Sequence, residues 1–361
     1  MSLETLFKRL PIPRRMNMEG VGVDLSEVSL RFVKLAPKKE GFELRDFGEY
    51  PIPEGTISLG QIQKPDVLKG VLERLKKEHN INFVHSSLPE SLAYLADMDI
   101  PAVKNSELYE SVELQMEEYV PMNVADSVFD YDVIGTNKNK PGTLTVITSV
   151  VPANVVTSYI NVFTSAGITL LSLETDSSAL SRAVIPKGSL ETSMLLDLGR
   201  IKTGVYVVSH GTVFFVSDID IGEKDIVASL IKELSISSAE AKEMMIKLHA
   251  NEEPSEEAYN AISSVFDDLR EEVNKHFIYW HSYRDKNGAK REPIERIILC
   301  GSGSSLFGLQ ESLMTELRIP IGIANVWGNV FSFEKDIPKI SFQDSLLYST
   351  AIGLSLYSKK F

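Results

Sequence analysis

The chain has 361 residues, of which 43% are hydrophobic and 24% are charged, a balance typical of a globular protein with room for two or more domains. Its net charge of −13 at pH 7 argues against nucleic-acid binding, which needs a basic surface. The single cysteine, Cys300, excludes a disulfide framework and a zinc cluster and fits a reducing cytoplasm. The sequence contains no apolar run of about 18 residues, so no membrane-spanning helix is predicted.

Residues 1–15 form a leader that differs from the rest of the chain. Leu3, Leu6, Phe7 and Leu10 fall at helical spacing among basic residues, and Pro11 ends the pattern. Two interpretations stay open. The leader either packs on its own domain or forms a short basic amphipathic helix on a membrane or a partner.

Two stretches of the chain repeat one order of elements. Each has an apolar strand with an aspartate near its end, a tight turn, a hydroxyl residue and a second strand, and the aspartates are Asp24 and Asp197. A third strand and an amphipathic helix follow. The first copy covers residues 20–25, 28–35, 42–50 and 65–78, and the second covers 193–198, 203–208, 212–218 and 224–234. Because order and spacing both recur, we predict two related halves that face each other across a cleft.

A different unit separates the two copies. A predicted helix begins at Ser106 and stops at Pro121, because proline cannot continue a helix. Predicted strands at 128–134 and 143–151 follow, and then a helix at 154–166 that ends at Gly167, a glycine suited to a C-cap. This pattern predicts a small α+β insert.

The second copy carries further helices. We expect them at 238–248 and 256–283, followed by a strand at 296–299 that leads into Gly301-Ser302-Gly303 and a helix to Leu317, and a last helix at 345–357. The predicted organisation is a leader at 1–15, a first subdomain at 16–85 with 166–187 and 341–361, an insert at 86–165, a second core at 188–222 with 294–340, and an upper helical subdomain at 223–293.

The turns of both copies and the glycine-rich loop are candidate phosphate-binding sites. Glycines let a ligand approach the backbone, and turns and helix starts offer free N–H groups. A tight strand-to-helix turn also needs glycine without any ligand. The candidate cofactor-binding residues are Asp24, Ser26, Ser29, Asp197, Gly199, Thr203, Gly301, Ser302 and Gly303.

The two repeated aspartates are also candidate metal ligands. Each of Asp24 and Asp197 could cap its own turn. As a pair they could instead hold Mg²⁺ through water molecules. Further along, Glu174 and Asp176 precede a helix at 178–184. They are either helix caps or a pair that positions an attacking water, with Asp176 as the candidate catalytic residue. No Ser-His-Asp or Cys-His arrangement is apparent.

The chain resembles the PilM family of type IV pilus assembly proteins, which is related to the division protein FtsA. The resemblance covers nearly the whole chain. It rests on Phe7-Lys8-Arg9, Gly22 to Leu35, Ser87-Leu88-Pro89, Met98 to Pro101, Glu117 to Pro121, Asp130 to Val133, Ala166-Gly167-Ile168, Glu174 to Ala183, the second hairpin, Gly301-Ser302-Gly303 and Ala351 to Leu354.

The resemblance implies an α/β, actin-like fold of duplicated ribonuclease H-like halves with an FtsA-type α+β insert. It also implies a cytoplasmic location at the inner face of the inner membrane, where such proteins hold the N-terminal tail of the membrane protein PilN in a groove between the first subdomain and the insert. Tyr119, Val120 and Pro121 match the edge of that groove. Alternatively, these residues end a helix that packs on the insert's own sheet.

The nucleotide loops depart from the family's pattern. Ser26 replaces a glycine, and Glu27 adds a carboxylate where phosphate charge would lie; two like charges ~4 Å apart repel by roughly 4 kcal/mol at an effective dielectric of ~20. The helix that should carry an acid and a lysine to the ribose and base has Lys242 and Met245 instead. We therefore expect weak or absent binding of Mg-ATP.

Three functional hypotheses remain. The first is a non-catalytic or very weakly hydrolytic adaptor that binds a PilN-like tail, with a pilus motor ATPase and further copies of itself as other partners and with only indirect membrane contact. The second is an active ATPase of the actin superfamily. The third is an FtsA-like division protein, disfavoured because the chain ends at Lys359-Lys360-Phe361 directly after a predicted core helix.

Overall fold

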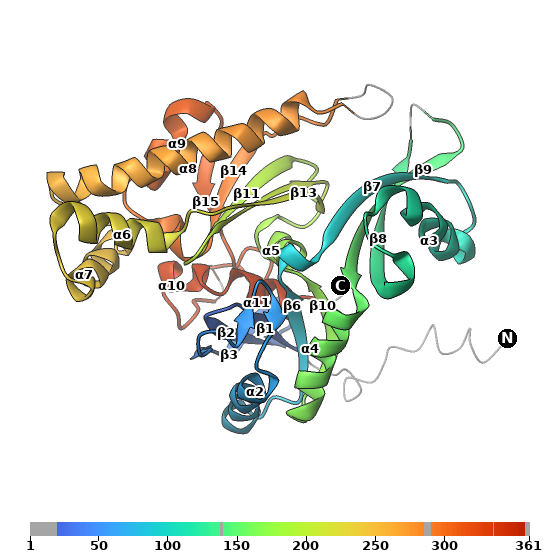
Figure 1. Cartoon of the computed structure of the whole chain (residues 1–361), viewed down its shortest axis with the longest axis horizontal. Helices are drawn as coiled ribbons and strands as arrows, with labels where there is room; N and C mark the ends of the chain where they lie inside the picture. Colours follow the sequence, from blue (N-terminus) through green and yellow to red (C-terminus); the bar gives the residue numbers. More distant parts are fainter. Residues whose placement is uncertain (1–19, 138–139, 285–289, 335, 358–361) are drawn as a thin grey trace.

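Two five-stranded sheets with the same strand order form the two halves of this computed structural model, which describes residues 20–357 except 138–139, 285–289 and 335 (Figure 1). The order is β10-β6-β1-β2-β3 in the first half and β15-β14-β11-β12-β13 in the second. The first set is β1 Val21–Leu25, β2 Ser29–Pro37, β3 Phe42–Pro51, β6 Phe83–Leu88 and β10 Thr169–Thr175. The second set is β11 Thr192–Leu198, β12 Thr203–Ser209, β13 Thr212–Ile219, β14 Arg296–Cys300 and β15 Ile321–Ile323.

The pairing directions of the two sheets also agree. In each half the three strands of the repeated unit are antiparallel, and the remaining two run parallel to its first strand. The predicted duplication is therefore confirmed at the level of topology. The leader at 1–15 and the last four residues, 358–361, lie outside the described residues.

Two helices lie between the halves. They are α5 Asp176–Val184 and α11 Ser349–Ser355, and a cluster of buried side chains from both sheets packs around them. The two helices cross closely at Gly353, where an added Cβ would lie 1.8 Å from the carbonyl oxygen of Ala179. The short helix α10 Phe342–Leu346 precedes α11. The predicted single helix at 345–357 is thus two helices.

The second half is covered by four helices that share one apolar core with its sheet. They are α6 Glu223–Leu234, α7 Ser238–His249, α8 Glu256–Ser282 and α9 Leu309–Leu317. Trp280 and Phe266 of α8 are among the largest fully buried side chains. No helix in the described ranges combines the length and the apolar character needed to cross a bilayer.

The insert is a three-stranded sheet with one helix. The strands are β7 Tyr94–Pro101, β8 Ser127–Thr136 and β9 Thr143–Pro152, in the order β7-β9-β8. The helix α3 Leu108–Tyr119 buries Val112 and Met116 against the sheet in a small core of its own. The insert therefore folds as a separate unit at one side of the molecule, beside the two halves (Figure 1).

The helix that follows the insert does not belong to it. Helix α4 Ala153–Ser165 packs against α2 Pro65–His79 and β10, and its Tyr159 and Phe163 are buried in the core of the first half. The hydroxyl of Tyr159 also donates to the carbonyl oxygen of Gly60 at 2.8 Å, beside the small hairpin of β4 Ile57–Ser58 and β5 Gln61–Ile62. The folded insert is therefore residues 94–152, shorter than the predicted 86–165.

Candidate functional site

Three aspartates meet in the cleft between the halves. Asp24 lies near the end of β1, Asp197 near the end of β11, and Asp176 begins α5. Burial, together with the charge of Asp24, raises the pKa of Asp197 to about 6. Burial also raises the pKa of Asp176 well above its usual range, with the charges of Asp24 and Asp197 adding to the shift. The sequence therefore identified three residues that the fold does bring within electrostatic range.

Two residues that the sequence argument did not place in the site hold this cluster. The hydroxyl of Ser87, at the end of β6, donates to Asp24 Oδ1 at 3.0 Å. The Glu90 carboxylate accepts the Ser177 N–H at 3.0 Å at the start of α5, and burial raises the pKa of Glu90 to about 7. In contrast, Asp176 Oδ1 is buried and has no hydrogen-bond partner among the described residues.

The metal prediction for Asp24 and Asp197 stays a prediction. Among the described residues, no group of three or more His, Cys, Asp or Glu side chains has the arrangement of a direct metal site. Coordination through water molecules, as predicted, would not require such a group. The fourth acidic residue, Glu174, is a structural residue: its carboxylate forms an ion pair with Arg182, whose Nη1 also donates to the Gly353 carbonyl at 2.9 Å.

A chain of ion pairs crosses the cleft beside the aspartates. Arg31 on β2 pairs with Glu49 on β3 at 3.1 Å, and Arg200 from the turn of the second half pairs with the same carboxylate oxygen at 3.3 Å. We call Arg31, Glu49 and Arg200 the cleft clasp. Its Arg31 guanidinium lowers the pKa values of Asp24 and Asp197, which opposes the effect of burial. The clasp was not predicted from the sequence, because Arg200 reaches Glu49 from the other half of the chain.

The first turn uses its own backbone donors. The Ser26 hydroxyl accepts the N–H groups of Val28 and Ser29 at 3.4 and 3.1 Å, and it donates to the Ser29 carbonyl at 3.0 Å. The Ser26 side chain therefore engages two N–H groups of its own turn. The Glu27 carboxylate accepts the Leu59 N–H at 2.6 Å, a contact with the β4–β5 turn that the sequence did not predict.

The second turn supports the start of α6. Gly199 N–H donates to the Lys202 carbonyl at 3.0 Å, and the Gly199 carbonyl accepts from Glu223 N–H at 3.1 Å. The Thr203 hydroxyl donates to the Ile221 carbonyl at 2.6 Å. These candidate phosphate ligands therefore have structural partners in the protein itself.

The glycine-rich loop approaches the second aspartate. Gly301 has φ of +79°, and a Cβ there would lie 2.4 Å from Asp197 Oδ1. Only glycine meets both conditions. Ser302 and Gly303 lie in a 3₁₀ turn, Ser302–Ser305, and α9 begins only at Leu309. The predicted order of strand, glycine-rich loop and helix to Leu317 is confirmed, but the helix starts a few residues after the loop, which closes on itself through Ser304 N–H and the Gly301 carbonyl.

Lys242 and Met245, on the helix expected to reach the ribose and base of a nucleotide, lie in different environments. Lys242 is exposed on α7, whereas Met245 is 6% exposed and packs in the apolar core of the second half. Neither residue therefore presents the acid and the lysine that the family's pattern places there.

The predicted partner-binding residues end α3. Val120 is buried in the core of the insert, Tyr119 is half-buried against that core, and Pro121 is exposed. A pocket of about 550 Å³ begins at the next residue. It is lined by Met122, Asn123, Ala125, Asp126, Ser127, Pro152, Ala153 and Asn154. The pocket therefore lies where the insert joins α4 of the first half.

The outer edge of the insert's sheet faces the first half beyond this pocket. Strand β8 pairs only with β9, and β10 pairs only with β6, among the described strands. Arg182, which stacks over Tyr357 at 5.1 Å, lowers the pKa of Asp132 on β8, although burial and the charge of Asp130 raise it overall. Acidic residues of the insert therefore lie near the Arg182–Tyr357 pair of the first half.

The family described as type IV pilus assembly protein PilM matches residues 22–359. A chain from a solved "PilM-PilN type IV pilus biogenesis complex" is 18% identical, with a TM-score of 0.76, and the match covers 97% of this chain and 100% of that chain. The ethanolamine utilization protein EutJ from Carboxydothermus hydrogenoformans is 14% identical over 96% of this chain and 91% of that one, with a TM-score of 0.55. MreB5 of Spiroplasma citri, solved bound to ADP, is 11% identical over 94% and 95%, with a TM-score of 0.52. The fold is thus actin-like, as predicted.

Proposed function

Because the chain belongs to the type IV pilus assembly protein PilM family, we propose that it acts as a cytoplasmic, actin-like adaptor at the inner face of the inner membrane, where it binds the N-terminal tail of a PilN-like protein. The observation that carries this proposal is the pocket at the junction of the insert and α4. It adjoins Pro121, one of the residues that match the groove's edge.

The surroundings of the pocket suit a short peptide. Two strand edges, β8 and β10, flank the junction and have no further partner strand among the described residues, so an extended peptide could form main-chain hydrogen bonds there. Asp130 and Asp132 add negative charge to one side. A tail with a basic residue would complement that charge.

The test is direct binding of a labelled peptide, taken from the cytoplasmic N-terminus of a PilN-like protein, measured by fluorescence anisotropy. Ala125 is exposed in the pocket, and Ala125→Trp would fill it. We expect at least ~10-fold weaker binding, because a bulky ring removes the space for an anchoring side chain.

The matched control is Ala250→Trp, which places the same ring at an exposed position after α7. This variant should bind the tail as the wild type does. Equal loss in both variants, or full binding by Ala125→Trp, would contradict the proposed groove.

We further propose that the adaptor binds Mg-ATP weakly or not at all. The use of two first-turn N–H groups by Ser26 supports this proposal, as does the core position of Met245. Calorimetric titration with Mg-ATP tests it, and binding at micromolar affinity would overturn it.

The remaining partner proposals are a pilus motor ATPase and further copies of this chain. Analytical ultracentrifugation of the purified protein, alone and with the motor, tests both. A single monomeric species under both conditions would contradict them.

A further inference from the structure

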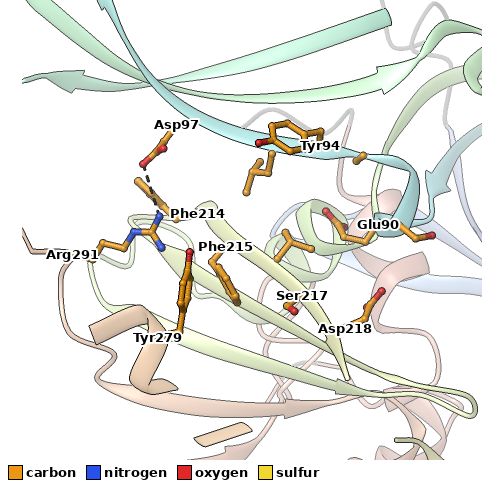
Figure 2. A pocket seen from close by; sticks show the side chains of 13 residues that line it. Glu90, Tyr94, Asp97, Phe214, Phe215, Ser217, Asp218, Tyr279 and Arg291 are labelled. Carbon is orange, nitrogen blue, oxygen red and sulfur yellow. Dashed lines mark ion pairs between the residues drawn. The ribbon is translucent and has the colours of Figure 1, made fainter. Parts of the chain in front are cut away.

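The insert has a second open edge, on the side away from the proposed tail groove. Strand β7 faces β13, the outer strand of the second half, and a pocket of about 380 Å³ lies between them (Figure 2). It is lined by Glu90, Ser91, Ala93, Tyr94, Leu95, Asp97, Phe214, Phe215, Val216, Ser217, Asp218, Tyr279 and Arg291. We call it the β7–β13 pocket.

Both strands present unused backbone to this pocket. Each is the terminal strand of its sheet, β7 beside β9 and β13 beside β12. Within the described chain, no main-chain hydrogen bond joins residues 94–97 to residues 214–218. Facing edges of this kind can accept an extended segment as an added strand.

A β-bulge gives the pocket an aromatic wall. The register of β13 against β12 shifts between Val207 and Val208, and Phe214 is the residue left without a partner. In a regular strand, neighbouring side chains point to opposite faces, but a bulge re-aims one of them. Phe214 and Phe215 both line the pocket, with Tyr279 of α8 beside Phe215 at 5.6 Å between ring centroids, and these three rings form its aromatic wall.

Arg291 is a fixed cation with spare hydrogen-bonding capacity. Its guanidinium lies 3.7 Å from the ring centroid of Tyr283 and 4.5 Å from that of Trp280. Its Nη1 atom is buried and has no acceptor among the described residues. Its Nη2 atom lies 3.9 Å from an Asp97 oxygen, too far for a hydrogen bond. A buried charged donor without an acceptor is costly, so a ligand that supplied one would gain binding energy.

The other charges of the lining are taken up elsewhere. Asp218 forms an ion pair with Lys202. The Glu90 carboxylate accepts the Ser177 N–H. The contact between Asp97 and Arg291, at 3.9 Å, is therefore weaker than the contacts made by the other two charged residues of the lining, Asp218 and Glu90.

We propose that the β7–β13 pocket binds a short extended segment of a partner protein that carries an acidic residue. In this complex the segment's carboxylate accepts hydrogen bonds from the Arg291 guanidinium. It lies where the Asp97 carboxylate now approaches that guanidinium. The aromatic wall contacts the neighbouring side chains of the segment, and one of the two strand edges bonds to its backbone.

The test uses phage-displayed random octapeptides as the probe. They are selected on the full-length protein and then counter-selected on Arg291→Gln. We expect the recovered peptides to contain Asp or Glu among β-branched residues. Their affinity, measured by fluorescence anisotropy, should fall at least ~10-fold in Arg291→Gln, as for loss of a charge-assisted bidentate contact.

The variant Asp97→Asn should change peptide affinity in the opposite direction. It removes the carboxylate that competes with the ligand for Arg291, and we expect ~2- to 5-fold tighter binding of the same peptides. Ser91→Trp fills the pocket without altering the stacked arginine and should abolish binding. Ser106→Trp, an exposed serine of the insert outside the pocket, should bind as the wild type does. Thermal unfolding of each variant shows whether it is folded.

Three outcomes would overturn the proposal. They are selection of no peptide that depends on Arg291, selection of peptides without an acidic residue, and weaker binding by folded Asp97→Asn. Peptides lost in Ala125→Trp but retained in Arg291→Gln belong to the tail groove and count against the β7–β13 pocket. The two variants therefore test the two sites separately: Ala125→Trp tests the tail groove, and Arg291→Gln tests the β7–β13 pocket.

Discussion

Asp197 lies where both burial and the charge of Asp24 disfavour its ionised form, so that its pKa rises to about 6. The usual value is 3.8, so the folded chain holds this proton more tightly than the unfolded chain does. Stability is then lost as the pH rises from about 4 through 6, because the folded state must release a proton that the unfolded state has already lost.

We expect Asp197→Asn to raise the free energy of unfolding at pH 8 by on the order of 1–2 kcal/mol, since the amide carries no charge to bury. The gain should disappear below about pH 4. Denaturant unfolding at a series of pH values measures it. Asp268→Asn, at an exposed position on α8, is the control and should change stability little at any pH. A gain that is independent of pH would show that repulsion in the cleft is not the cause.

Ser26 is the second residue with a local effect that can be tested. Ser26→Gly frees the Val28 and Ser29 N–H groups and removes the Cβ. If these groups limit phosphate binding, the variant should bind Mg-ATP at least ~10-fold more tightly than the wild type in calorimetry, with Ser26→Ala between the two. No gain in Ser26→Gly would mean that the clasp or the second turn limits binding instead.

Among the elements, the crossing of α5 and α11 sets the distance between the halves. Gly353→Ala places a Cβ 1.8 Å from backbone of Ala179, which cannot move like a side chain, so we expect a loss of about 3 kcal/mol or more. Thermal or denaturant unfolding measures it. Gly70→Ala is the matched control, because it lies in α2 with nothing within 4 Å of the added Cβ, and it should stabilise by about 0.5–1 kcal/mol.

The elements also show where sequence reasoning succeeds. The repeated strands were predictable because each copy alternates or runs apolar over a short stretch between clear turns. Strands β6 and β10 were missed, since His85-Ser86-Ser87 and Ser172 break their apolar pattern, although the fold buries β6 and half-buries most of β10. The assignment of α4 to the insert was wrong, because an apolar face shows that a helix packs but not on which core.

In the candidate site, too, residues in local sequence motifs could be predicted, whereas residues that depend on the folded topology could not. Asp24, Asp176, Asp197 and Gly301 follow from local motifs and do meet in the cleft. Ser87, Glu90 and the cleft clasp could not be found this way. Their roles depend on neighbours that only the folded topology supplies, and single serines or glutamates carry no pattern of their own.

For the whole molecule, the clasp joins the two halves across the cleft. Arg200→Gln should cost less than about 1 kcal/mol of global stability, because Arg200 is partly exposed and such pairs contribute little. It should, however, increase amide hydrogen exchange in the turns on both sides of the cleft. The exchange of α8 is the internal control. Unchanged exchange at both turns would indicate that the helices between the halves, and not the clasp, hold the cleft.

The bond between Glu90 and the Ser177 N–H has a mechanical consequence. Glu90 lies in the short link by which the chain enters the insert, and Ser177 follows the cleft residue Asp176 on α5. A hydrogen bond thus attaches the base of the insert to the helix that begins with Asp176, an acid with one buried oxygen that has no hydrogen-bond partner among the described residues. A tilt of the insert by a partner at either of its edges would shift the first turn of α5, so that mechanical load on the insert and the proton occupancy of the cleft would be transmitted to each other.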